Sequence, residues 1–254
     1  MIFKLSRNVL PLIALALPLL AQPGGGQGRG GPPPTAKAQA PIDLTGSWMA
    51  LVNEDWKYRM VTPLPGDYNG VPMNVAARRV ADAWDPAKDE ASGDACKSYG
   101  AANLIRIPGN LRISWVDDNT MKVEMDAGTQ TRTFHFGNYK PPANAEPSWQ
   151  GESVAKWDVQ RTAPGEPRHG SLMVTTTNLK AGYLRKNGVP YSDKTTLTEY
   201  WDIINEPRTN EQKIIVTTVV DDPTYLTQTF VTSTNFKKQP NDSAFKPSPC
   251  SAKW

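Results

Sequence analysis

The clearest structural pattern in the chain lies in Leu111–Phe136, which reads LRISWVDDNTMKVEMDAGTQTRTFHF. Polar and apolar residues alternate along three short runs, and Asp117-Asp118-Asn119 and Ala127-Gly128 separate these runs as turn sequences. Alternation with a period of two is typical of strands that have one buried face. The stretch therefore predicts three consecutive antiparallel strands over Leu111–Val116, Thr120–Asp126 and Thr129–Phe136.

The same pattern continues on both sides of this stretch. It predicts further strands at Ile42–Asn53, around Leu104–Ile107, and at Gly151–Val159, Ser171–Asn178, Thr195–Ile204, Gln212–Val220 and Thr227–Phe236. Strands at this spacing without intervening helices favour an all-β fold, an antiparallel meander of about eight to ten strands closed into a barrel or folded as a sandwich. A barrel also removes the exposed edges of a meander.

One helix is expected before the main meander, over Asn74–Trp84. Asn74 is a favourable N-cap, and Pro86 marks the end of the helix. Val75, Val80 and Trp84 fall near one face of this helix.

The N-terminal segment is predicted to direct export. Residues 1–21 combine basic Lys4 and Arg7 with the apolar run Val9–Leu20 and a small residue, Ala21, which is the layout of a secretory signal peptide. The run is too short for a membrane span. We expect a periplasmic or extracellular protein with no transmembrane anchor after cleavage. Residues 22–40, rich in Gly and Pro, predict a flexible tether before a single domain at 41–254.

Composition excludes several classes of function. The chain has 254 residues, with 28 Lys+Arg against 25 Asp+Glu. Without Lys4 and Arg7 the count is 26 to 25, so no basic face is available for a nucleic acid. Two Cys and two His leave little for a structural zinc site. No cofactor motif is found, and the oligomeric state is not predicted.

Cys96 and Cys250 are the two thiols of the chain. Export favours their pairing as a disulfide, which would hold the C-terminal tail against the segment that follows the helix. The alternative is a pair of free buried thiols.

Several motifs resemble known families. Gly46-Ser47-Trp48, at the start of a first strand, is similar to the Gly-x-Trp motif of lipocalins. Over Cys96–Lys238 the chain resembles a family of secreted acidobacterial and proteobacterial proteins of unassigned function. The residues that carry this second resemblance are Pro147–Ser153 with Trp157, Val174–Asn178, Thr198-Glu199-Tyr200 and Asp221-Asp222-Pro223-x-Tyr225. It implies a lipocalin-like β-barrel and brings no established chemistry, and Gln160–Gly170 departs from the family pattern.

Alternation also predicts which polar groups point inward. Glu199 shares a strand face with Leu197, Trp201 and Ile203, and Arg132 shares one with Phe134 and Phe136. A buried charge is costly unless it is paired. We therefore expect Arg132 and Glu199 to meet each other, as an ion pair that fixes strand register, or to meet a ligand.

Other candidates are weaker. His135 should face away from the core. Ser153 in Gly-Glu-Ser-Val-Ala partly matches a nucleophile elbow, but it lies inside a strand pattern where the elbow needs a strand-to-helix turn. Asp82, Asp85, Asp89, Glu90 and Asp94 provide oxygen ligands of the kind that calcium prefers, but their spacing fits no EF-hand, so no metal is predicted.

The first hypothesis is that the exported barrel binds a small, largely apolar molecule. Trp48, Phe134, Phe136, Trp157 and Trp201 would line the cavity, with Arg132 and Glu199 as polar anchors. A second hypothesis is a cofactor-independent isomerase, cyclase or lyase with Glu199 as base and Arg132 as electrostatic stabiliser. A third is a solid structural or interaction module.

Overall fold

The structure, a computed structural model, describes residues 33–160, 163 and 169–253. Within them, residues from Pro34 onward belong to one compact unit. The predicted signal peptide and most of the predicted tether lie outside the described residues. Among the helices of the described part, none is long and apolar enough to cross a membrane.

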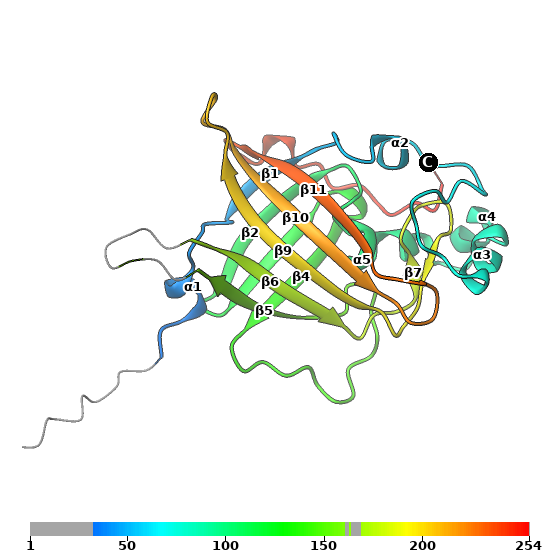
Figure 1. The fold of residues 1–254 in the computed structure, drawn as a ribbon, viewed down its shortest axis with the longest axis horizontal. Helices are drawn as coiled ribbons and strands as arrows, with labels where there is room; N and C mark the ends of the chain where they lie inside the picture. The colour runs from blue at the N-terminus through cyan, green and yellow to red at the C-terminus, as the bar shows by residue number, and fades with distance from the viewer. Residues whose placement is uncertain (1–32, 161–162, 164–168, 254) are drawn as a thin grey trace, which may run out of the picture. The chain divides into compact units, whose positions relative to one another are not determined.

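The described elements are mainly strands, with short helices before β2 (Figure 1). The helices are α1 (Ala36–Gln39), α2 (Trp56–Arg59), α3 (Val75–Asp82), α4 (Pro86–Ala91) and α5 (Ala101–Leu104), with 3₁₀ turns η1 (Ala95–Tyr99), η2 (Ala127–Thr129) and η3 (Asp242–Ala244). The strands are β1 (Gly46–Leu51), β2 (Asn110–Asp117), β3 (Thr120–Met125), β4 (Gln130–Phe136), β5 (Glu152–Val159), β6 (Gly170–Thr177), β7 (Gly182–Tyr183), β8 (Pro190–Tyr191), β9 (Thr196–Asn205), β10 (Gln212–Asp221) and β11 (Phe230–Gln239).

The predicted barrel is confirmed. Its strands close in the order β1-β11-β10-β9-β6-β5-β4-β3-β2, and β7 and β8 form a separate hairpin. The pairing is antiparallel except between β4 and β5, where Phe134 pairs with Ser153 in a parallel register. Segment 137–151 causes this difference, because it returns along the barrel before β5 begins (Figure 1).

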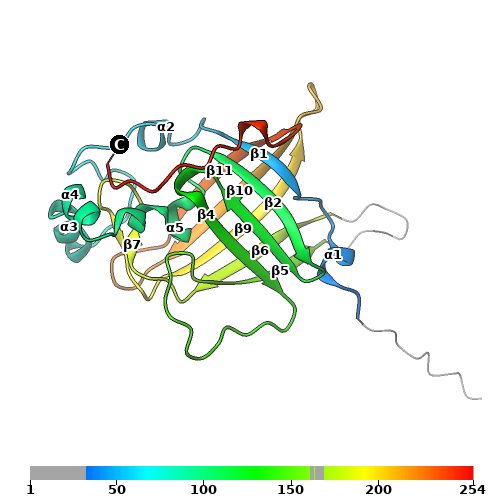
Figure 2. The same ribbon diagram turned by 180° about the vertical axis from the view of Figure 1, so that it is seen from behind.

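One end of the barrel is covered by a cap, which we define as segments 52–109 and 178–195. Helices α2–α5 and the hairpin β7–β8 lie in these segments, and both ribbon views place them at the same end (Figures 1 and 2). Leu104 and Ile105 pack with the barrel core, whereas Ala101 and Ala102 pack with the cap core. Helix α5 therefore seals the barrel mouth with apolar contacts on both of its sides.

In the cap, the structure differs in two places from what the sequence suggests. Asn74 does cap α3, since its Oδ1 accepts a hydrogen bond from the Ala77 amide at 2.9 Å. Val75 and Val80, however, are exposed, and the small side chains of Ala77 and Ala81 face the core instead. The strand expected around Leu104–Ile107 is helix α5 and the turn after it, because these apolar residues cover the barrel mouth rather than join the sheet.

At the opposite end of the barrel, ordered structure begins before the expected boundary at Pro41. Residues Ala36–Gln39 form α1, Ala36 is buried, and its carbonyl accepts a hydrogen bond from Trp157 Nε1 at 2.7 Å. Residues 36–39, predicted as part of the flexible tether, instead form a helix that packs against the barrel.

Candidate functional site

Arg132 on β4 and Glu199 on β9 form a buried, bidentate ion pair. The Arg132 guanidinium donates to both carboxylate oxygens, at 2.9 and 2.6 Å, and both side chains have no exposed surface. The predicted pairing is confirmed. The alternation of polar and apolar residues predicted this ion pair because each residue lies on the apolar face of its strand, and those faces point toward each other inside the barrel.

This pair belongs to a polar layer inside the barrel. Arg132 also donates to Thr176 Oγ1 at 3.1 Å, and that hydroxyl shares a hydrogen bond of 2.8 Å with Ser153 Oγ. Strand pairing places further polar residues of the neighbouring strands beside them, on the interior face of the barrel. We define the polar layer as Arg132, Ser153, Thr176, Glu199, Thr218, Thr232 and Thr234, all buried.

The polar layer lies toward the cap. Glu199 is near the start of β9, which directly follows cap segment 178–195. Thr218 near the end of β10 and Thr232 near the start of β11 flank loop 222–229, which contacts the cap through the bridge between Met73 and Leu226. On the α1 side, the interior is apolar and contains Phe136, Ile214 and Phe236. The barrel is therefore divided along its axis into a polar and an apolar part.

Several polar atoms around this layer are not satisfied. Thr218, Thr232 and Thr234 hydroxyls, Arg132 Nε and Trp201 Nε1 are buried and have no hydrogen-bond partner among the described residues. A buried polar group without a partner costs about 1–3 kcal/mol. Five such atoms in one part of a core are unusual, because buried polar groups in folded proteins are normally paired.

The predicted aromatic lining separates into two groups. Phe134 and Trp201 are fully buried beside the polar layer, with an edge-to-face contact of 5.7 Å between ring centroids, and the Arg132 guanidinium lies 4.9 Å from the Phe134 ring. Trp48 is also fully buried, and its indole N–H donates to the Leu44 carbonyl at 2.9 Å.

Trp157 is placed differently. Its ring packs against Phe136 and Trp115, at 5.4 and 6.4 Å between centroids, and its indole N–H binds the α1 carbonyl of Ala36. The structure therefore brings Phe134 and Trp201 to the polar anchors and puts Trp157 at the α1 end.

Two weaker candidates take the positions expected for them. His135 faces away from Phe134 and Phe136 and stacks on Tyr139, with 3.9 Å between ring centroids. Ser153 lies within β5, with its hydroxyl in the polar layer, so the strand-to-helix turn of a nucleophile elbow is not formed around it.

The predicted disulfide is confirmed: Cys96 and Cys250 are bonded, with 5.1 Å between their Cα atoms. It joins the C-terminal tail to η1 in the cap. The tail is also held by the Ala252 amide, which donates to Glu90 at 2.6 Å.

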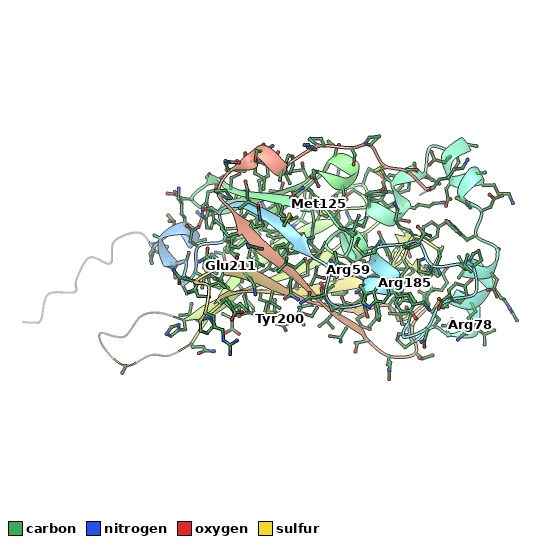
Figure 3. All side chains as sticks on the ribbon, turned by 90° about the horizontal axis from the view of Figure 1, so that it is seen from above. Arg59, Arg78, Met125, Arg185, Tyr200 and Glu211 are labelled. Carbon is green, nitrogen blue, oxygen red and sulfur yellow. A yellow bond between two sulfur atoms is a disulfide. The ribbon has the colours of Figure 1, made fainter. Side chains whose placement is uncertain are left out.

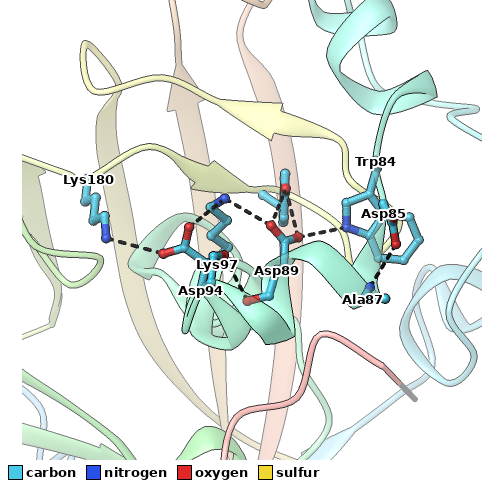
Figure 4. A network of polar contacts seen from close by, with 9 residues as sticks. Trp84, Asp85, Ala87, Asp89, Asp94, Lys97 and Lys180 are labelled. Atoms are coloured by element: carbon cyan, nitrogen blue, oxygen red, sulfur yellow. Dashed lines mark hydrogen bonds and ion pairs between the residues drawn. The ribbon is translucent and has the colours of Figure 1, made fainter.

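Two carboxylates of the acidic cluster in the cap, Asp89 and Asp94, pair with neighbouring side chains. Asp89 accepts hydrogen bonds from Lys97 at 3.0 Å, Trp84 at 3.2 Å and Tyr183 at 3.0 Å (Figure 4). Asp94 pairs with Lys97 and Lys180, and the Lys97 ammonium lowers the pKa of the Asp94 carboxyl. The described residues contain no group of three or more His, Cys, Asp or Glu arranged to hold a metal ion.

Among the features that sequence patterns missed is a group of buried arginines in the cap. Arg59, Arg106 and Arg185 are each 3–4% exposed. They lie in segments without regular periodicity, so no sequence signal predicted their burial.

Comparison of the chain with protein-family models, with curated proteins and with solved structures finds no match. The resemblance to a secreted bacterial family therefore stays a prediction.

Proposed function

We propose that the protein binds a small molecule in the capped end of the barrel, with an oxygen-bearing polar group of that molecule at the polar layer and its apolar part against Phe134 and Trp201. The observation that carries this proposal is the set of five unpaired buried polar atoms. Trp201 Nε1 and Arg132 Nε can only donate, and the threonine hydroxyls can donate or accept. This set favours a carbonyl or hydroxyl oxygen as the group that is bound.

The ion pair has a structural role in this proposal. Both oxygens of Glu199 already accept from Arg132, so the pair holds the guanidinium in one orientation and leaves Nε as the guanidinium nitrogen without any hydrogen-bond partner among the described residues. A general base must come within hydrogen-bond reach of the proton that it removes. No contact of Glu199 specifically favours that role, so binding is preferred over the isomerase, cyclase or lyase hypothesis.

Cyclohexanone and cyclohexane provide a matched pair of probes that differ in the carbonyl group. We expect saturable quenching of tryptophan fluorescence by both in the wild-type protein. The Thr218→Val/Thr234→Val variant should reduce the ratio of ketone to hydrocarbon affinity by about five-fold or more, because it removes hydrogen-bonding groups and keeps their volume.

The control is Thr217→Val, since Thr217 lies on the same strand and faces outward. It should leave the ratio of the two affinities unchanged. The proposal is wrong if neither probe gives a saturable change, or if the double variant discriminates between the probes as the wild type does.

A further inference from the structure

Arg185 is a buried cation without a carboxylate partner. Its side chain is in the cap, the residue is 3% exposed, and no acidic group of the described chain lies within ion-pair distance of it. Its one hydrogen bond goes from Nη1 to the Asn69 carbonyl at 2.8 Å, and its guanidinium lies 4.1 Å from the Tyr58 ring centroid. Burial lowers the pKa of Arg185 to about 10, and the charge of Arg106 adds to this effect. An unpaired buried charge is unfavourable unless a counter-ion is supplied.

A second buried arginine, Arg106, acts on the charge of Arg185, and a third, Arg59, contacts Arg106. Arg59 donates from Nε to the Arg106 carbonyl at 2.8 Å and pairs with Glu54 at 2.5 Å. Arg106 pairs with Asp55 at 3.0 Å, and the positive charge of Arg106 acts on both Arg59 and Arg185. Three buried guanidinium groups therefore form ion pairs with two carboxylates, both of them partly exposed. The nearby carboxylate of Asp67 acts on Arg185 only at longer range and is itself paired with Lys57.

Each of the three arginines keeps one buried nitrogen without a hydrogen-bond partner among the described residues: Arg59 Nη2, Arg106 Nη1 and Arg185 Nε. Guanidinium groups bind carboxylate and phosphate oxygens through paired N–H donors. A ligand with a carboxylate or phosphate group would both balance the excess positive charge and accept hydrogen bonds from the unused donors.

The position of the cluster connects it to the barrel. The Arg106 guanidinium lies 5.7 Å from the ring of Phe230, the first residue of β11, and Thr232 of the polar layer is two residues further along that strand. In Figure 3, Arg59 and Arg185 lie within the body of the molecule, whereas Arg78 on α3 is at its periphery.

We propose that Arg59, Arg106 and Arg185 form a binding site for an oxyanion, the carboxylate or phosphate group of a small molecule, at the junction of the cap and the barrel. This site does not require a ligand in the polar layer. An anion placed among the three arginines supplies the missing negative charge and accepts from their unused N–H groups.

The test is isothermal titration calorimetry of the full chain with inorganic phosphate and, separately, with acetate, at an ionic strength held constant with sodium chloride. The wild-type protein should bind at least one of the two anions saturably at one site, and the preferred anion shows whether the ligand group is a phosphate or a carboxylate. Arg185→Met should weaken binding by about ten-fold or more, because it removes a charge and its donors.

Arg78→Met is the matched control, since Arg78 belongs to the same cap and is exposed. It should keep the wild-type affinity for the anion within about two-fold. Thr218→Val/Thr234→Val should also keep this affinity, because its substitutions lie in the barrel site, so the anion site and the barrel site can fail independently of each other. If Arg185→Met does not fold, Arg185→Lys replaces it as the test variant, because lysine keeps the charge and loses the planar guanidinium. We expect Arg185→Lys to bind the anion at least about three-fold more weakly than the wild type. The absence of saturable binding of both anions, or wild-type affinity in the deciding Arg185 variant, overturns the proposal.

Discussion

Replacing Glu199 with Gln is expected to lower the free energy of unfolding by about 3–5 kcal/mol. The substitution leaves the Arg132 guanidinium, which has no exposed surface, without the carboxylate that it pairs with. The amide keeps the shape of the side chain, so the loss measures the uncompensated charge rather than a cavity. Urea denaturation followed by circular dichroism measures the change.

Two controls isolate the cause. Glu206→Gln removes one partner of the partly exposed Lys213–Glu206 pair and should cost less than about 1 kcal/mol. Arg132→Met/Glu199→Leu removes both buried charges and should recover most of the stability lost in Glu199→Gln. A Glu199→Gln protein as stable as Glu206→Gln would show that the pair does not hold the barrel together.

Loss of the disulfide is the second large effect. Cys96→Ser/Cys250→Ser should reduce the free energy of unfolding by about 2–5 kcal/mol, because the bond closes most of the barrel into one loop and so restricts the unfolded chain. The change should be seen in the urea midpoint of the double variant and in that of the reduced wild-type protein.

The expected loss in the free energy of unfolding includes smaller values because the tail also has contacts that do not involve the disulfide. Ser248 and Ala252 amides still bind Asp126 and Glu90 when the sulfurs are removed, so part of the docking survives. Ala252→Pro, which removes the amide donor and keeps the disulfide, should cost less than the double Cys variant. If the double Cys variant and the wild type unfold at the same urea concentration, the disulfide has no part in stability.

Local alternation was sufficient to predict both the barrel and its ion pair. Arg132 and Glu199 lie on strands whose apolar faces are evident from the neighbouring residues. In a closed barrel the apolar faces of all strands point into the same interior, so the two side chains point into the same space. The unpaired threonine hydroxyls were not predicted. Thr218 and Thr232 occur in Thr-rich strands in which both faces carry hydroxyls, so polarity alone does not show which ones are buried.

Features that depend on the path of irregular segments were also missed. The parallel pairing of β4 with β5 follows from the return of segment 137–151 along the barrel. The periodicity of the sequence does not indicate the path of this segment. Arg106 and Arg185 come close through the turn after α5 and the loop after β7, which are far apart in the chain. Long-range contacts of this kind are set by tertiary packing and leave no local pattern.

The most direct test of ligand binding in the polar layer is native mass spectrometry on protein recovered from cells that produce it with its own N-terminal segment, followed by a denaturing run on the same sample. We expect a native mass above that of the polypeptide, an adduct that is released on denaturation, and less of that adduct in Thr218→Val/Thr234→Val than in Thr217→Val. A native mass equal to the denatured polypeptide mass in the wild-type protein would contradict the account.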